Sequence, residues 1–302
     1  MGKKISYSSP LKVFWKDFYG TQKKITPNLT DEQVFSVLRN NLIKAPLSNG
    51  ETLESRELLM SGLELWKTDS DGDLLHIFFL ETQLRDFLEK TPLSDLDGLR
   101  TFLYENGSSK EVIYFRTKAI SNCVQYNFGL HIPNETEGYA FSLGIYDDNS
   151  VELYFSHGNQ NGRISDKFYT DVKKKKDIKS LSLAKYFRLS INTIAYMKCF
   201  PECVLDGVPK IVEDIHDVRS ERNVNIKLAE KITDPETFGN SKLPHFRKGY
   251  FKMLRSDFYT NKKGQIIFVS ETMVKGKAKT VSTSTQIQEF EKHAGKEKPE
   301  IQ

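Results

Sequence analysis

The C-terminal part of the chain contains a dense group of side chains that can bind phosphate. Between Lys242 and Lys279, ten residues are lysine or arginine and two, Asp257 and Glu271, are acidic, so this segment carries 10 − 2 = +8. The whole chain of 302 residues carries +4, which leaves −4 for the remainder. We call Lys242–Lys279 the basic segment. Its charge favours contact with an anionic partner, although a solvated basic edge has the same composition.

Within the basic segment, Phe246–Arg255 has the composition of a β-strand. Residues two apart in a strand share a face, so Lys248, Tyr250 and Lys252 lie on one side and Arg247, Phe251 and Met253 on the other. Cations and aromatic rings that alternate along a surface are typical of nucleic-acid grooves, where charges contact phosphates and rings stack on bases. The alternative is an amphipathic outer strand whose lysines prevent edge pairing.

A second strand is predicted at Gln265–Val269, which is apolar enough to be buried on both faces and to anchor a β-hairpin. An aspartate at Ile267 should therefore unfold the hairpin. Gly249 allows a close backbone approach, and Arg247 can bind a phosphate or carboxylate with two parallel hydrogen bonds. We expect the following residues to contact a nucleic acid or another partner: His245, Arg247, Lys248, Gly249, Tyr250, Lys252, Arg255, Lys262 and Lys263.

Catalytic and metal-binding patterns are absent from the sequence. It has no carboxylate cluster, no H-E-x-x-H, no glycine-rich phosphate loop and no nucleophile elbow. Cys199 and Cys203 form a C-x3-C pair without a second pair of ligands, and Asp69–Asp73 does not continue into a calcium loop. We therefore expect no metal and no cofactor, and we favour binding over enzymatic activity. A nuclease remains an alternative.

The first 108 residues are predicted to form a mainly helical N-terminal region. Thr30 and Gln33 have the spacing of a capping box, which begins one helix. Apolar residues at helical spacing predict further helices, and the run Leu74–Leu80 predicts a buried strand. The other predicted helices are 53–67, 82–90 and 94–104.

After residue 108 the pattern changes to short strands. Strands are predicted at 112–117, 124–132, 139–146 and 151–155, the last two joined by a tight turn at Asp147–Ser150. Ser156–Lys179 is polar and predicts a loop, whereas Ser182–Cys199 predicts a helix that packs on the sheet. The predicted fold is thus α+β: N-terminal helices, a central antiparallel β-meander with a packed helix, and a C-terminal basic β-hairpin. The α+β domain should span 109–280, and 281–302 should be a disordered tail.

Composition indicates the compartment. Hydrophobic residues make up 38% and charged residues 28% of the chain, which is typical of soluble globular proteins. No apolar run reaches the roughly 18 residues that span a bilayer, and no signal peptide is recognisable. Three scattered cysteines suit a reducing compartment. We therefore expect a cytoplasmic protein that does not contact a membrane.

The basic segment also resembles a family carried by phages and plasmids. Pro244–Phe251, with the sequence PHFRKGYF, followed by the strand IIFVSETMVKGKA, is similar to that family's C-terminal signature P-H-x-R-R-G-H-W and the strand after it. The family includes an anti-CRISPR protein directed against a type V nuclease. The resemblance implies an α+β fold and interference with production of the target nuclease through recognition of a nascent chain or its message.

This resemblance covers about residues 180–279 and has departures. Lys248, Tyr250 and Phe251 stand where the family has arginine, histidine and tryptophan, so a chemistry that requires two histidines is not available here. His245, Arg247 and Gly249 match the signature. The expected function is a mobile-element inhibitor that binds RNA, a ribonucleoprotein or a nascent chain. A protein-binding module with an acidic partner is the first alternative, and a nuclease the second.

Overall fold

The computed structural model describes part of the chain. The described residues are 20–47, 50–67, 77–107, 116–120, 122–133, 135, 137–158, 160–175, 178–207, 209, 224–229, 246–247, 249–270 and 272–273. Residues 69–73 and the predicted tail 281–302 lie outside them, and so do Pro244, His245 and Lys248 of the Pro244–Phe251 signature.

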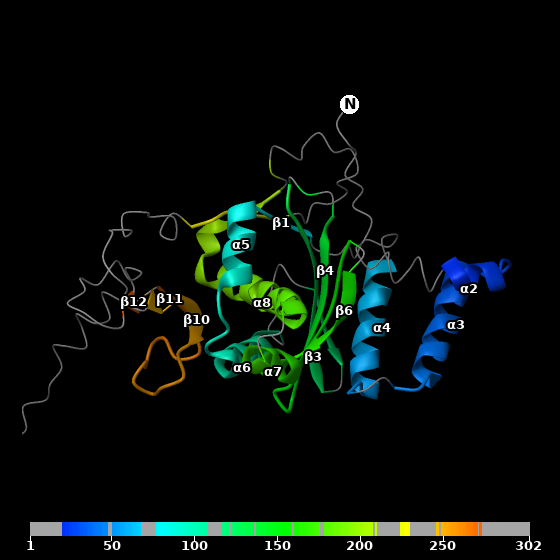
Figure 1. Ribbon diagram of the computed structural model, residues 1–302, viewed down its shortest axis with the longest axis horizontal. Helices are drawn as coiled ribbons and strands as arrows, with labels where there is room; N and C mark the ends of the chain where they lie inside the picture. Colours follow the sequence, from blue (N-terminus) through cyan, green and yellow to red (C-terminus); the bar gives the residue numbers. More distant parts are fainter. Residues whose placement is uncertain are drawn as a thin grey trace, which may run out of the picture.

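A mixed β-sheet forms the centre of the protein (Figure 1). Its strands are β1 (Ile77–Leu80), β2 (Arg116–Ile120), β3 (Cys123–His131), β4 (Tyr139–Tyr146), β5 (Val151–His157), β6 (Gln160–Ser165), β7 (Val204–Asp206) and β8 (Val224–Ile226). The order is β6-β5-β4-β3-β1-β8-β7, and β2 pairs separately with β3. Strands β2 to β6 form an antiparallel meander, and the predicted α+β class is confirmed.

Strand β1 is the parallel member of this sheet and joins its two halves. It pairs in parallel with β3 at Gly129–His131 on one side and with β8 on the other. Strand β2 pairs with β3 over Cys123–Asn127, so β1 and β2 occupy successive lengths of one edge of β3. A strand from the first 108 residues therefore lies between strands that follow them in the sequence.

Four helices cover one face of the sheet: α5 (Thr82–Lys90), α6 (Leu96–Gly107), α7 (Asp166–Lys175) and α8 (Ile178–Cys199) (Figure 1). The apolar residues of alternate strand positions point at these helices because strand side chains alternate between faces. Phe128, Phe141 and Phe155 of the sheet and Phe187 and Ile191 of α8 belong to one core. The predicted helix at 182–199 is confirmed and is longer than expected.

The opposite face carries helix α4 (Leu53–Lys67), against which α3 (Asp31–Lys44) packs, with α2 (Gly20–Ile25) beyond it (Figure 1). The capping box is confirmed: Thr30 Oγ1 accepts from Gln33 N, and Gln33 Oε1 accepts from Thr30 N. Beneath α4 the sheet is polar. Gln125 Nε2 donates to the carbonyl of Leu58 at 3.0 Å and so ties α4 to β3.

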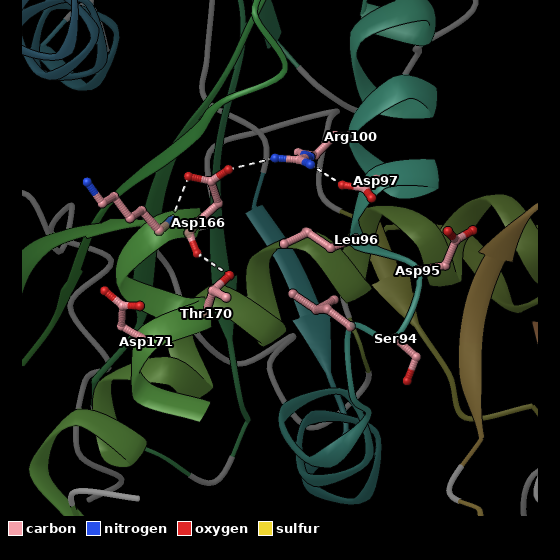
Figure 2. Close-up of a pocket in the computed structure, with 10 residues that line it drawn as sticks. Ser94, Asp95, Leu96, Asp97, Arg100, Asp166, Thr170 and Asp171 are labelled. Atoms are coloured by element: carbon pink, nitrogen blue, oxygen red, sulfur yellow. Dashed lines mark hydrogen bonds and ion pairs between the residues drawn. The ribbon is translucent and has the colours of Figure 1, made fainter. Parts of the chain in front are cut away.

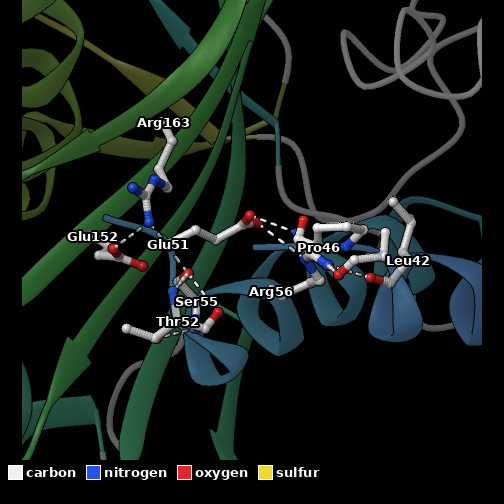
Figure 3. A network of polar contacts seen from close by, with 9 residues as sticks. Leu42, Pro46, Glu51, Thr52, Ser55, Arg56, Glu152 and Arg163 are labelled. Carbon is white, nitrogen blue, oxygen red and sulfur yellow. Dashed lines mark hydrogen bonds and ion pairs between the residues drawn. The ribbon is translucent and has the colours of Figure 1, made fainter. Parts of the chain in front are cut away.

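Buried charges join α3, α4 and the sheet edge (Figure 3). Arg56 of α4 donates to the carbonyls of Leu42 and Ala45, each at 2.5 Å, and pairs with Glu51 at 2.6 Å. These bonds satisfy C-terminal carbonyls of α3 that the helix cannot satisfy itself. On the sheet, Arg163 pairs with Glu152 at 3.1 Å. Because each of these charges has an oppositely charged neighbour, we interpret the network as structural: it holds α3, α4 and the sheet together.

The prediction of a polar loop at Ser156–Lys179 is wrong. Residues 160–165 form β6, and α7 follows directly. Ser165 Oγ accepts from Phe168 N at 3.1 Å, as an N-cap does, and Tyr169 and Val172 are buried in the core. The run of lysines at the end of this segment favoured a loop in the prediction, although Tyr169 and Val172 have the spacing of a short apolar stripe on a helix.

The single strand predicted at Phe246–Arg255 is divided in two. Strand β9 (Phe246–Arg247) pairs with β12 (Thr272–Met273), whereas β10 (Tyr250–Met253) pairs antiparallel with β11 (Ile266–Val269). The predicted hairpin is present in the second pair. We call residues 249–270 the hairpin and residues 254–265 its tip loop.

The core is continuous from helices α5 and α6 to the hairpin. Leu84 of α5, Phe102 of α6 and Phe251 of β10 belong to the same buried cluster as the sheet. That cluster crosses residue 108, where the sequence predicts a division. Within the described ranges, no helix combines the length and the apolar character needed to cross a membrane.

Candidate nucleic-acid interface

The hairpin is anchored in the core by alternate side chains. Phe251 is fully buried, and Met253 and Ile266 are buried beside it. Phe268 packs between helices, its ring centroid 5.5 Å from that of Phe87 in α5 and 6.2 Å from that of Phe200 after α8. The hairpin is thus fixed to the body of the protein. Strand β11 was predicted to be buried on both faces, but Ile266 is its one buried residue and Ile267, Phe268 and Val269 are partly exposed. Helix α8 contacts β11 on the side of the core.

The outward side of the hairpin carries predicted contact residues. Tyr250 and Lys252 alternate with the buried Phe251 and Met253, as predicted for this strand. Lys252 lies opposite Ile267 in the pairing register. The resulting surface is partly exposed and combines one ring, one cation and aliphatic carbon.

The tip loop is held by its own backbone. Gly264 N donates to the carbonyl of Leu254 at 2.8 Å, and Leu254 N donates to the carbonyl of Gln265 at 3.0 Å. Gly264 has φ +86°, which favours glycine, and closes the loop. Lys262 N and Lys263 N both donate to the carbonyl of Tyr259. Both lysines are therefore placed by an ordered turn.

An aromatic residue that the sequence did not mark stands at this loop. Phe258 is 64% exposed, far more than the other phenylalanines described. Its ring meets that of Tyr259 edge to face, with centroids 5.6 Å apart and planes at 81°. A signal was present, because Phe258 lies in a stretch of turn residues rather than in a strand, where an apolar side chain would be buried.

Arg255 forms an ion pair with Asp95 of the same chain. Its Nη2 donates to Asp95 Oδ1 at 2.8 Å, and Asp95 Oδ2 accepts from Met253 N at 3.1 Å. Asp95 also accepts from Gly98 N at the start of α6. The side chain of Arg255 is still 52% exposed. Asp95 thus ties the hairpin to α6 and leaves Arg255 at the surface.

A polar pocket of about 480 Å³ lies beside this contact, between the N-terminal ends of α6 and α7 (Figure 2). Arg100 bridges Asp97 and Asp166, with Arg100 Nη1 2.7 Å from Asp166 Oδ2. With Asp95 and Asp171 the lining has four aspartates against Arg100 and Lys167, or −2. Asp97 and Asp166 stand in the first turns of their helices, where the helix dipole stabilises anions. The net negative charge of this lining disfavours phosphate.

The other residues expected to contact a partner are His245, Arg247, Lys248, Gly249 and Lys263. His245 and Lys248 lie outside the described residues, and the side chain of Arg247 does too. Gly249 is buried: a Cβ there would lie 2.5 Å from Cζ of Phe268 and 3.1 Å from the carbonyl oxygen of Val269. Glycine is required at this position by packing inside the hairpin. Lys263 pairs with Asp257 at 2.5 Å on the exposed loop.

His157, at the end of β5, is partly buried against aromatic rings. His157 stacks on Tyr139 with centroids 3.9 Å apart, and its Nδ1 lies 3.2 Å from the hydroxyl of Tyr186. Burial, reinforced by Lys185 and Arg85, lowers the pKa of His157 to about 4. It is therefore neutral at pH 7. Among the described residues, no three His, Cys, Asp or Glu side chains are grouped so that they could hold a metal ion.

Comparisons with known proteins give no relatives. No protein-family model matches the chain, and neither the curated proteins nor the solved structures include a significant match.

Proposed function

We propose that this protein binds RNA, alone or in a ribonucleoprotein, through the outward side and tip loop of its hairpin. The observation that carries the proposal is the rigid attachment of a cationic and aromatic surface to the core. Phe251 and Ile266 are buried in the core and hold the hairpin to it, while Lys252, Lys262 and Phe258 lie at or near its surface. Phosphates and bases are the groups such a surface recognises.

The charge of the hairpin supports an anionic partner. Residues 249–270 contain Lys252, Arg255, Lys262 and Lys263 against Asp257, which gives 4 − 1 = +3. The Lys263–Asp257 pair is exposed, and pairs of this kind contribute little, so a phosphate can replace the carboxylate. The resemblance of the basic segment to the phage- and plasmid-borne family suggests that the bound RNA belongs to the production of a host nuclease.

The test removes two cations that have no ion pair within the described residues. In the variant Lys252→Gln/Lys262→Gln, affinity for a single-stranded RNA should fall by on the order of tenfold at 0.1 M salt. The slope of log K against log salt concentration should become shallower by about 1.4, at 0.7 per lost phosphate contact. Fluorescence anisotropy at four salt concentrations gives both quantities.

Lys24→Gln/Lys44→Gln is the matched control, because it removes the same charge from exposed positions of α2 and α3. The control should bind as the unaltered protein does. Equal losses in both variants would mean that only net charge matters. If the unaltered protein retains no RNA but captures an acidic protein in a salt-dependent way, the protein-binding alternative holds.

A further inference from the structure

We infer that the hairpin takes single-stranded RNA and that Phe258 stacks against an unpaired base. This inference rests on the proposed RNA binding and assigns its substrate class. It starts from an exposed ring: Phe258 is 64% exposed in a tip loop whose other exposed side chains are polar. Exposing such a ring to water is unfavourable, and a ligand with an apolar face would cover it.

The loop presents the ring in a fixed position. Tyr259 N donates to the carbonyl of Ser256, and Gln265 N donates to that of Lys262, at 3.0 and 3.1 Å. Tyr259 lies against the ring of Phe258. Together with the bonds of Leu254 and Gly264, these contacts order the loop before any ligand arrives. A preordered platform loses little conformational entropy on binding.

Cations lie on both sides of Phe258 in the sequence of the tip loop. Lys262 and Lys263 follow Phe258 in the same turn, and Arg255 precedes it with half of its side chain exposed. A ring flanked by cations fits a base flanked by phosphates. In duplex RNA the bases are stacked on one another, so their faces are covered and are not open to the ring of Phe258.

The experiment compares two RNAs and two variants, all with the full chain. The probes are a labelled 12-nucleotide single-stranded RNA without self-complementarity and a stem-loop RNA, mostly double-stranded, of the same base composition. The unaltered protein should bind the single strand more tightly. Phe258→Ala should weaken single-strand binding by about 5- to 150-fold, the range for loss of one stacked base, and leave duplex binding unchanged.

Two further readouts separate stacking from charge and from folding. Phe258→Ala removes no cation, so the slope of log K against log salt should stay as in the unaltered protein. Phe258→Trp should restore single-strand affinity because indole also stacks. Leu53→Ala, a truncation at another exposed apolar side chain on α4, should have no effect on binding.

The outcomes distinguish this inference from the proposed function. If the unaltered protein binds RNA but Phe258→Ala binds the single strand equally well, or if the duplex is preferred, the stacking assignment is wrong while RNA binding stands. If the unaltered protein binds neither RNA in 50 mM salt, the proposed function fails and the inference fails with it.

Discussion

At the scale of single residues, burial decides the protonation of His131 and His157. His131 ends β3 with 3% of its surface exposed, and its ring meets that of Phe79 edge to face, with centroids 5.6 Å apart. Loss of solvation lowers its pKa to about 4. The unfolded chain, in which histidine titrates near 6.5, therefore binds a proton more readily than the folded protein. The stability that the neutral His131 contributes is fully present above pH 6.5 and is lost as the pH falls toward 4.

Because of this difference in pKa, we expect acidification to lower the unfolding free energy of the unaltered protein more than that of a variant without His131. Between pH 7 and pH 4 the unaltered protein should lose on the order of 3 kcal/mol more unfolding free energy than His131→Gln. Glu89 and Glu152 act in the opposite direction, because burial raises their pKa, but they are common to both proteins. Urea titrations at four pH values measure the difference. Parallel pH profiles would show that His131 titrates normally in the folded state.

At the scale of elements, the two faces of β11 give a matched pair of substitutions. Ile266 is buried in the core, and its neighbour Ile267 is partly exposed on the outward side, opposite Lys252. Ile266→Asp should lower the unfolding free energy by more than about 3 kcal/mol, because it buries an unpaired charge. Ile267→Asp, which the sequence alone led us to expect would unfold the hairpin, should instead cost about 1 kcal/mol or less because Ile267 is partly exposed. Thermal and urea unfolding of both variants provides the test, and equal losses would mean that the strand faces are misassigned.

Elements were predictable where the local signal was complete. The capping box of Thr30 and Gln33 fixed the start of α3 because both bonds are made within four residues. Strand β6 and helix α7 were missed, because Gln160–Ser165 has one buried apolar residue, Ile164. Such a strand exists through its pairing with β5, which is a tertiary effect.

The candidate site was predictable in part for a similar reason. Charge and alternation indicated Lys252 and its neighbours, since both are properties of the sequence. The exposure of Phe258 and the contact of Asp95 with Arg255 depend on how the hairpin docks against α6. Asp95 and Arg255 are 160 residues apart, and no local pattern joins them.

At the scale of the whole molecule, β1 decides whether the first 108 residues form an independent unit. It lies between β3 and β8, and Phe78 at its centre is fully buried, with its ring centroid 5.6 Å from that of Phe128. Parallel neighbours are supplied by distant parts of a chain, so the pairing could not be inferred from Leu74–Leu80 alone. The shared core makes cooperative unfolding of both parts the expected behaviour.

The distribution of tryptophan provides a test with the intact protein. Trp15 and Trp66, the two tryptophans of the chain, precede residue 108, so tryptophan fluorescence reports on that part, whereas far-ultraviolet circular dichroism reports on the whole. Both probes should give one urea midpoint. Phe78→Ala should lower that midpoint equally for both, by the equivalent of about 3 to 5 kcal/mol, because β1 packs with strands on either side of it. Ile25→Ala, a truncation of an exposed side chain on α2, should leave both midpoints unchanged. Two separate transitions, of which Phe78→Ala moves one, would show that the sheet divides near residue 108 and that β1 belongs energetically to one side.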